Sequence, residues 1–292
     1  MRIIDLFHTG SPVFSIEIFP PKTEEGMETL KIRLMEFKKS HPDFISVTYG
    51  AGGGTRHNTH ELASYIKNQM QIEALAHLTC VSHTKAEINL VLDHLAQSKI
   101  ENIMALRGDP LKNEERFQKP QDGFEYASEL ITAIRQRKEF GIGGAGYPEG
   151  HPEAENIEKH FEHFLIKVAA GADFIITQLF LDNDLFLKWR DRVRSHGIKI
   201  PLIAGVMPPL SAQQITRFAS TCGCTIPEPL LSKLKRYESD TEAMRQVGLD
   251  FAQTQIEGLI EEGVEGVHLY ALNRLQAVQR LAPIFKKNET AS

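Results

Sequence analysis

The sequence predicts a (β/α)8 TIM barrel that forms a single domain. Short apolar runs of strand length alternate with longer segments whose apolar residues recur every three or four positions. Eight such strand–helix units follow one another, and 292 residues is enough chain for one barrel of this kind. No internal repeat, low-complexity tract or interdomain linker divides the chain, so we expect residues 1–292 to form one catalytic domain.

The expected strands are short apolar runs that end at glycine or proline. Pro20 and Pro21 end the first strand, a run of glycines ends the second, and Pro208 follows the seventh. The fifth has the weakest pattern, because it is rich in glycine and ends at Pro148. We place the strands at residues 13–19, 44–49, 73–79, 102–106, 142–147, 173–180, 201–206 and 266–271.

The segments between these strands have the spacing of amphipathic helices. Thr84 and Glu87 match a capping box, which predicts a helix start after the third strand. Residues 227–262 are helical in character but contain no obvious strand, so we expect extra helices before the last strand. Residues 286–292 are expected to form a disordered tail.

The composition favours a globular protein that acts on small molecules. Hydrophobic residues make up 41% of the chain and charged residues 24%. The net charge of −5 argues against a broad nucleic-acid-binding face, which would have to be basic. No apolar run approaches the roughly 20 residues of a membrane span, and no secretory signal is visible. The three cysteines fit a reducing compartment, so we expect a cytoplasmic protein.

Polar side chains stand at one end of nearly every predicted strand. In a TIM barrel the carboxyl ends of the strands meet at one rim, which carries the active site. Seven of the eight strands deliver a polar or aromatic residue to that rim, whereas the seventh offers only backbone groups. These residues are Glu17, Thr48, His77, Arg107 with Asp109, Tyr147, Gln178 and Tyr270.

Two motifs at this rim indicate chemistry. Arg107, Gly108 and Asp109 follow the fourth strand, where arginine can grip a phosphate and glycine admits a ligand close to the backbone. Glu17 lies between two isoleucines, and desolvation there favours the neutral carboxyl group that a general acid needs. Each has a plain structural alternative: a surface ion pair in a turn for the first motif, and an outward-facing ion pair for Glu17.

Four other residues give weaker signals. His77 could hold a carbonyl or a phosphate group, and Gln178 could bind the edge of a heterocycle, although hydrogen bonds within the barrel explain both equally simply. Gln214 and Phe218 follow Ser211 on a helix, where a capping box and core packing account for them on spacing alone.

Three patterns do not predict a site. Residues 141–146 fit the dinucleotide pattern G-x-G-x-x-G, but no buried strand precedes them and no helix follows. The glycines at 52–54 lack the pattern of a phosphate-binding loop. His151, His160 and His163 lack the carboxylate support of metal-binding histidines, so we expect no metal site.

Taken together, these residues resemble the methylenetetrahydrofolate reductase family, the flavin enzymes of one-carbon metabolism. The resemblance covers residues 14–274 and is to the short bacterial type, without the regulatory domain of the eukaryotic enzymes. The motifs come in the family's order, at residues 15–21 (SIEIFPP), 47–50 (VTYG), 77–80 (HLTC), 105–109 (ALRGD), 147–153 (YPEGHPE), 177–178 (TQ) and 270–274 (YALNR).

The resemblance implies a role for each matching position. Glu17 would be the general acid that opens the folate's five-membered ring, and Asp109 would tune the flavin and meet the pterin. The chain departs from the family pattern at His160 and Ile166, near the expected adenosine end of the flavin, and we leave both out of the predicted site. The implied FAD contacts are Thr48, His77, Arg107, Gly108, Asp109, Tyr126, Ala127, Tyr147, His151 and Lys167. The implied folate contacts are Glu17, Asp109, Gln178, Gln214, Phe218, Tyr270 and Leu272.

The implied reaction is the reduction of 5,10-methylenetetrahydrofolate to 5-methyltetrahydrofolate by ping-pong hydride transfer. NADH or NADPH would first reduce bound FAD, and the folate would then take the hydride. We therefore expect FAD, a nicotinamide donor, a folate substrate and a homo-oligomer, with no nucleic-acid or membrane partner. The residues leave two alternatives open: another flavin- or phosphate-ligand TIM-barrel enzyme, and a non-catalytic folate- or flavin-binding subunit.

Overall fold

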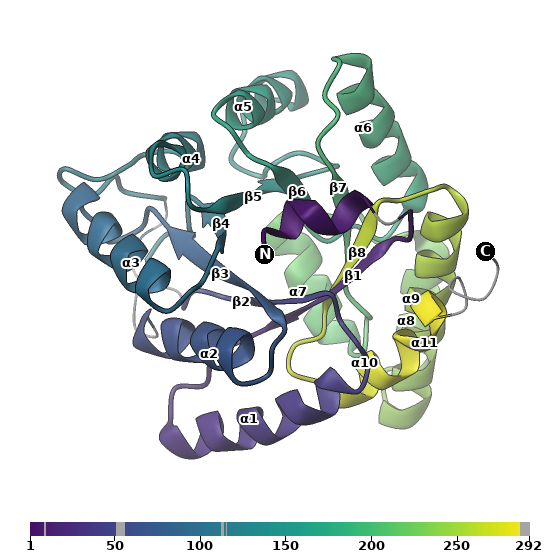
Figure 1. Ribbon diagram of the computed structural model, residues 1–292. Coiled ribbons are helices and arrows are strands. Elements are labelled where there is room, and N and C mark those ends of the chain that lie inside the picture. The colour runs from purple at the N-terminus through teal and green to yellow at the C-terminus, as the bar shows by residue number, and fades with distance from the viewer. Residues whose placement is uncertain (9, 51–55, 112–113, 115, 287–292) are drawn as a thin grey trace.

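The computed structural model is a closed barrel of eight parallel strands surrounded by helices (Figure 1), which confirms the predicted fold. Each strand pairs with the next in sequence, and β8 closes the barrel on β1. The structure describes residues 1–8, 10–50, 56–111, 114 and 116–286. The strands are β1 Val13–Ile18, β2 Phe44–Val47, β3 Glu73–Thr79, β4 Asn102–Leu106, β5 Gly141–Gly146, β6 Phe174–Thr177, β7 Leu202–Val206 and β8 Gly266–Tyr270.

The helices follow the strands as expected, and the region predicted to hold extra helices contains α8 and α9. Thr84 and Glu87 form the predicted capping box at the start of α3. Lys286 ends the last helix, and residues 287–292 of the predicted tail lie outside the described residues. None of the described helices is long and apolar enough to cross a membrane. The helices are η1 Ile3–His8 (3-10), α1 Glu24–Lys38, α2 Arg56–Asn68, α3 Lys85–Gln97, α4 Ala127–Gln136, α5 Ile157–Ala169, α6 Asn183–Ser195, α7 Ala212–Cys222, α8 Glu228–Arg236, α9 Thr241–Glu261, α10 Leu275–Leu281 and α11 Pro283–Lys286.

The sixth strand is shorter than its apolar run predicts. The pattern suggested residues 173–180, whereas β6 ends at Thr177. Beyond that point Leu179 and Leu181 pack with Ile215 of α7 and residues of α8 and α9 instead of continuing the sheet. An apolar run alone does not distinguish these two kinds of burial, which is why the predicted end is too late.

The amino-terminal half of the barrel interior is apolar. Inward-facing side chains of six strands form one cluster there, and Ile3 of η1 belongs to it. Asn102 fastens η1 to this end, because its Oδ1 accepts a hydrogen bond from the Ile3 amide at 2.8 Å. Figure 1 shows η1, in purple next to the N label, lying across the strands. The strand residues of the cluster are Val13, Phe44, Leu75, Met104, Phe174, Ile176 and Ile203.

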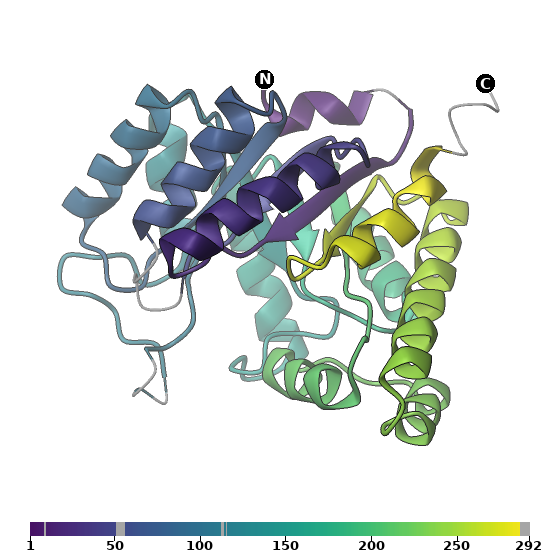
Figure 2. The ribbon, with the colours of Figure 1, turned by 90° about the horizontal axis from the view of Figure 1, so that it is seen from below.

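The opposite end of the barrel is where the strands terminate and the longer connections lie. Figure 2 shows the β4–α4 connection and the green helices α7 and α8 on the side of the barrel away from η1. A separate apolar cluster joins α7, α8 and α9 to the segments that follow β6 and β7. The apolar packing is thus divided between one closed end and the helices around the other end, which leaves the carboxyl ends of the strands for polar side chains.

Candidate active site

Glu17 lies on β1 with its side chain among polar groups of three strands. Its residue is 8% exposed. Its Oε2 atom lies 3.6 Å from His77 Nε2 on β3 and 3.6 Å from His268 Nε2 on β8. Ser46 of β2 donates to the same oxygen at 3.4 Å. The inward orientation follows from strand alternation, since Ile16 and Ile18 belong to the outer core between strands and helices. The outward-facing alternative for Glu17 is therefore wrong.

His77 is buried next to this carboxyl group. Burial lowers the pKa of its imidazole to about 4, which outweighs the opposite effect of the Glu17 charge. The ring is therefore neutral near pH 7. Its Nε2 atom lies 2.9 Å from Ser46 Oγ. Thr48, one residue beyond β2, is buried at the same rim, and its amide bonds to the carbonyl group of Ile18 at 3.0 Å.

Two tyrosines connect the Glu17 side of the rim with Asp109. Burial, followed by the charge of Glu17, raises the pKa of Tyr270, and Tyr147 also acts on it. Burial and then the charge of Asp109 raise the pKa of Tyr147 to about 12, and Gln178 hydrogen-bonds to this residue. Asp109, Tyr147, Gln178, Tyr270 and Glu17 therefore belong to one continuous region at the same end of the barrel.

Charged groups gather around His151 at the next part of the rim. Burial lowers the pKa of the His151 imidazole, and Arg107, Lys167, Glu153 and Asp109 all act on it electrostatically. Arg107 forms a bidentate ion pair with Glu153, at 2.7 and 3.0 Å. The surface-pair alternative for Arg107 thus holds in part, but its partner is Glu153 and not Asp109.

Gly108 has the backbone freedom that this rim requires. Its φ is +89°, and a Cβ atom there would lie 2.8 Å from a methyl carbon of Val81 and 3.1 Å from Thr79 Cβ. Any other residue would be strained by the backbone and would crowd the end of β3. The glycine therefore keeps Arg107 and Asp109 close to the neighbouring strand.

Helices α4 and α5 bring the remaining residues of the predicted cofactor set. Tyr126 precedes α4 at the N-cap position without a capping side-chain bond, and Ala127 is the first residue of the helix. Lys167 of α5 donates through Nζ to the Ala145 carbonyl group at 2.5 Å, and burial lowers its pKa to about 8. His160, one of the two departures from the family pattern, is buried and has an Nε2 atom without a hydrogen-bond partner among the described residues.

Gln214, Phe218 and Leu272 lie on the side of the rim formed by α7 and β8. Phe218, Tyr270 and Leu272 pack against the same apolar cluster. The predicted capping box is half present: Ser211 Oγ accepts from the Gln214 amide at 3.3 Å, whereas the Gln214 side chain accepts from Arg274 at 3.1 Å. A cavity of about 400 Å³ is lined by Ser211, Gln213, Gln214, Arg217, Phe218 and Arg274.

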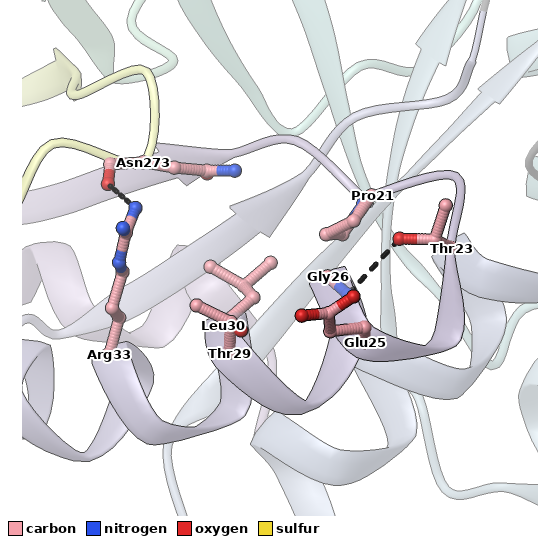
Figure 3. A pocket seen from close by; sticks show the side chains of 8 residues that line it. All are labelled: Pro21, Thr23, Glu25, Gly26, Thr29, Leu30, Arg33 and Asn273. Carbon is pink, nitrogen blue, oxygen red and sulfur yellow. Dashed lines mark hydrogen bonds between the residues drawn. The ribbon is translucent and has the colours of Figure 1, made fainter.

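A second cavity, of about 360 Å³, lies between the start of α1 and the β8–α10 connection (Figure 3). Arg33 points from α1 towards the Asn273 carbonyl group, at 3.4 Å. The Asn273 side chain also bonds to both the amide and the carbonyl group of Phe19, each at 2.9 Å. These two hydrogen bonds connect the end of β1, close to Glu17, to the loop after β8. None of the residues predicted to bind cofactor or folate lines this cavity.

Sequence reasoning missed several residues of this region. Ser15 and His268 lie beneath Glu17, Ser46 lies beside it, Glu153 binds Arg107, and Asn273 fixes the strand end. Strand alternation could have revealed His268, because it stands two residues before Tyr270 on a predicted strand. Residues 51–55, which include the glycine loop considered above, lie outside the described residues.

The methylenetetrahydrofolate reductase sequence profile matches residues 2–284. The chain belongs to this family. It is 36% identical to the 5,10-methylenetetrahydrofolate reductase of Escherichia coli over 262 residues, which is 90% of this chain and 86% of that protein. The corresponding Pectobacterium carotovorum protein is 33% identical, with the same coverage.

Members of the family from plants are longer. The chain is 36% identical to "Methylenetetrahydrofolate reductase (NADH) 1" of Arabidopsis thaliana, covering 94% of this chain but 49% of that protein. It thus spans about half the length of such relatives. Among solved structures, a Clostridium thermocellum protein described as binding two copies of 5-methyl-5,6,7,8-tetrahydrofolic acid has a TM-score of 0.64 at 15% identity, with 99% of both chains covered. That likeness supports the fold alone.

Proposed function

We propose that this protein reduces 5,10-methylenetetrahydrofolate to 5-methyltetrahydrofolate, using electrons from NADH that pass through bound FAD. This folate reduction is the activity for which the family is named. The observation that carries the proposal is the Glu17 carboxyl group, which is 8% exposed and lies between two imidazoles. No lysine or arginine pairs with it in the described part of the chain. A carboxyl group in that setting is suited to donate a proton.

The rim residues fit FAD. Lys167 carries an ammonium group whose pKa burial lowers to about 8, and among the described side chains no carboxylate pairs with it. A bound phosphate would pair with the protonated Lys167 ammonium group and so offset the unfavourable effect of burial on its charge. Helix α4 begins at Ala127 without a side-chain cap, so its first amides are available to an anion. When bound, FAD would carry the hydride from the nicotinamide to the folate.

The chain's own residues would bind the folate and handle its proton. Glu17 would protonate the leaving nitrogen as the five-membered ring opens, and Asp109 would stabilise the cation that forms on the folate. Gln178 would bind the pterin edge, while Phe218 and Tyr270 would provide aromatic surface. The remaining assignments to FAD and folate follow the family pattern given above. Residues 1–292 would act as one catalytic domain.

The electron donor and the setting of the enzyme are also proposals. The relatives from Arabidopsis thaliana and Zea mays are both named as NADH enzymes, which supports NADH over NADPH. Three free cysteines, with Cys80 buried, support a reducing, cytoplasmic location. We retain the homo-oligomeric state as an expectation from the sequence.

The test is an anaerobic spectrum of the purified protein. We expect flavin absorbance that NADH bleaches and that methylenetetrahydrofolate restores. In Glu17→Gln the NADH step should persist, while restoration by folate should slow by at least about 100-fold, the low end of what general acids contribute. Bleaching without restoration in the parent protein would favour another flavin enzyme. Normal folate turnover in Glu17→Gln would remove the proposed acid.

A further inference from the structure

We propose that His268 is a positioning residue for Glu17: its Nε2 atom accepts a hydrogen bond from the protonated carboxyl group and keeps the proton there until folate takes it. His268 was not among the residues expected from the sequence. The inference rests on the proposed function, because it assigns a task to the acid of that reaction.

Strand pairing brings the three groups together. In the register between β1 and β8, Ser15 stands opposite His268, and Glu17 stands opposite Tyr270. Ser15 and Glu17 are two residues apart, so their side chains point to the same side of β1, into the barrel. His268 therefore lies below Glu17 on the neighbouring strand, towards the apolar end of the barrel.

The His268 ring is held in place by its neighbours. The residue has no exposed surface. The ring stacks on Phe44, with centroids 5.9 Å apart and planes 18° apart, and meets Tyr270 edge-on at 5.4 Å. Its Nδ1 atom lies 2.7 Å from Ser15 Oγ. These contacts fix the direction of Nε2, which faces Glu17 Oε2 at 3.6 Å.

His268 Nε2 has no hydrogen-bond partner among the described residues. A buried polar atom without a partner is costly, and such atoms in folded proteins call for a functional or structural explanation. Glu17 is the polar group that this nitrogen faces. A small rotation of the Glu17 side chain would shorten the 3.6 Å separation to a hydrogen bond, which has a normal length near 2.9 Å.

In this proposal the ring proton of His268 lies on Nδ1, the nitrogen beside Ser15. A serine hydroxyl has a single proton. In the proposed arrangement Ser15 donates it to the carbonyl group of Val267, 3.3 Å away, and the Ser15 oxygen accepts from His268 Nδ1–H across the 2.7 Å contact. Nε2 of the neutral ring is then an acceptor only. It can be satisfied by the acid form of Glu17 but not by the carboxylate.

The other groups around Glu17 do not perform this task. His77 faces the same oxygen at 3.6 Å, but its Nε2 is already engaged by Ser46 Oγ at 2.9 Å. Ser46 is a neutral hydroxyl, and the Tyr270 hydroxyl donates to the Thr177 carbonyl group at 2.7 Å. From β2, β3 and β8, the titratable groups facing Glu17 are thus His77, His268 and Tyr270.

The test uses two amide replacements of His268. In His268→Gln the amide reaches about as far as Nε2 and can still face Glu17, whereas in His268→Asn it reaches only as far as Nδ1. Flavin reduction by NADH and its reoxidation by methylenetetrahydrofolate are measured separately by stopped flow across pH. Ser15→Ala, a small change that frees the ring to carry its proton on Nε2, serves as a second variant if either replacement folds poorly.

We expect His268→Asn to slow the folate step by about tenfold or more and His268→Gln to recover most of that loss. In His268→Asn and Ser15→Ala, the pH at which the folate rate declines on the alkaline side should fall by about one unit. A role confined to packing would instead slow both steps together and leave the pH profile in place. Equal rates for the Gln and Asn variants would also overturn the proposal.

Infrared spectroscopy separates this inference from the proposed function. The band of a protonated carboxyl group should be present in the parent protein, absent in Glu17→Gln, and shifted in His268→Asn. If the parent protein fails to reduce folate, the proposed function fails, while the band still reports the contact between Glu17 and His268. If folate is reduced but the band does not move in His268→Asn, only the His268 proposal fails.

Discussion

Replacing Gly205 of β7 with alanine tests how the barrel positions Tyr270. Gly205 donates its amide hydrogen to Thr177 Oγ1 at 2.9 Å. A Cβ atom at this position would lie 2.2 Å from the Thr177 carbonyl oxygen, and 2.7 and 2.9 Å from the ring and hydroxyl of Tyr270. The Tyr270 hydroxyl donates to that same carbonyl group at 2.7 Å. One added methyl group therefore presses on both partners of a single hydrogen bond.

The size of the effect follows from what must move. An added methyl group in a tight core costs about 1–3 kcal/mol, and the upper end applies here because the nearest atom belongs to the backbone of β6. Displacing Tyr270 adds about 1 kcal/mol for its hydrogen bond. We expect Gly205→Ala to lose about 4 kcal/mol of unfolding free energy. For a domain of this size the melting temperature would fall by about 6 °C.

The assay combines urea unfolding with steady-state kinetics. Because Tyr270 is a proposed folate contact, the KM for methylenetetrahydrofolate should rise by about tenfold, equivalent to about 1.4 kcal/mol of binding. Gly143→Ala is the matched control: a Cβ atom there would meet the Phe174 ring at 2.7 Å and Met104 Sδ at 3.0 Å, in the apolar layer. It should lower stability without changing this KM. A Gly205→Ala protein with unchanged stability and KM would refute the reasoning.

Three further predictions concern pH, charge and the strand end. The folded pKa of His77, about 4, lies below its ordinary value of 6.5. The stability that comes from keeping the ring neutral is therefore complete above pH 6.5 and is lost as the pH falls towards 4, with about 2 kcal/mol lost by pH 5. His77→Gln should remove that loss in unfolding curves measured against pH. Lys167, with a pKa of about 8, is still mostly protonated at pH 7, and burial makes that charge unfavourable. Lys167→Met should therefore stabilise the flavin-free protein by about 1–2 kcal/mol at pH 7 in thermal unfolding, while flavin retention on gel filtration falls. Lower stability of the variant would contradict this. Asn273→Gly keeps the positive φ of 58° but removes both hydrogen bonds to Phe19, so it should lower the unfolding free energy by about 2 kcal/mol. In stopped flow it should slow folate reduction more than NADH oxidation. Equal slowing of the two steps would argue against a link between Asn273 and Glu17.

Most of the barrel could be predicted because apolar residues recur at different spacings in its strands and its helices. All eight strands occur where apolar runs indicated them, and Glu17, His77 and Tyr270 face inward as alternation requires. The contact of Arg107 with Glu153 could not be predicted, because the segment after β5 brings a distant carboxylate to the end of β4. The end of β6 was placed too late for a related reason: apolar packing against α7 and α8 looks the same in sequence as packing within a sheet.

The apolar packing at the amino-terminal end of the barrel fixes the strand register, and the register in turn places Glu17. A slip of β1 by one residue against β8 would turn Ile16 inward and move Glu17 out among the helices, away from His268. Such a slip is opposed by Val13 and Phe44, which fill the barrel interior at the same time as Ile16 and Ile18 fill the outer core. The position of Glu17 between His77 and His268 is therefore determined largely by aliphatic and aromatic residues below the site. Substitutions of Val13 or Phe44 should therefore alter the folate step even though these residues touch neither ligand.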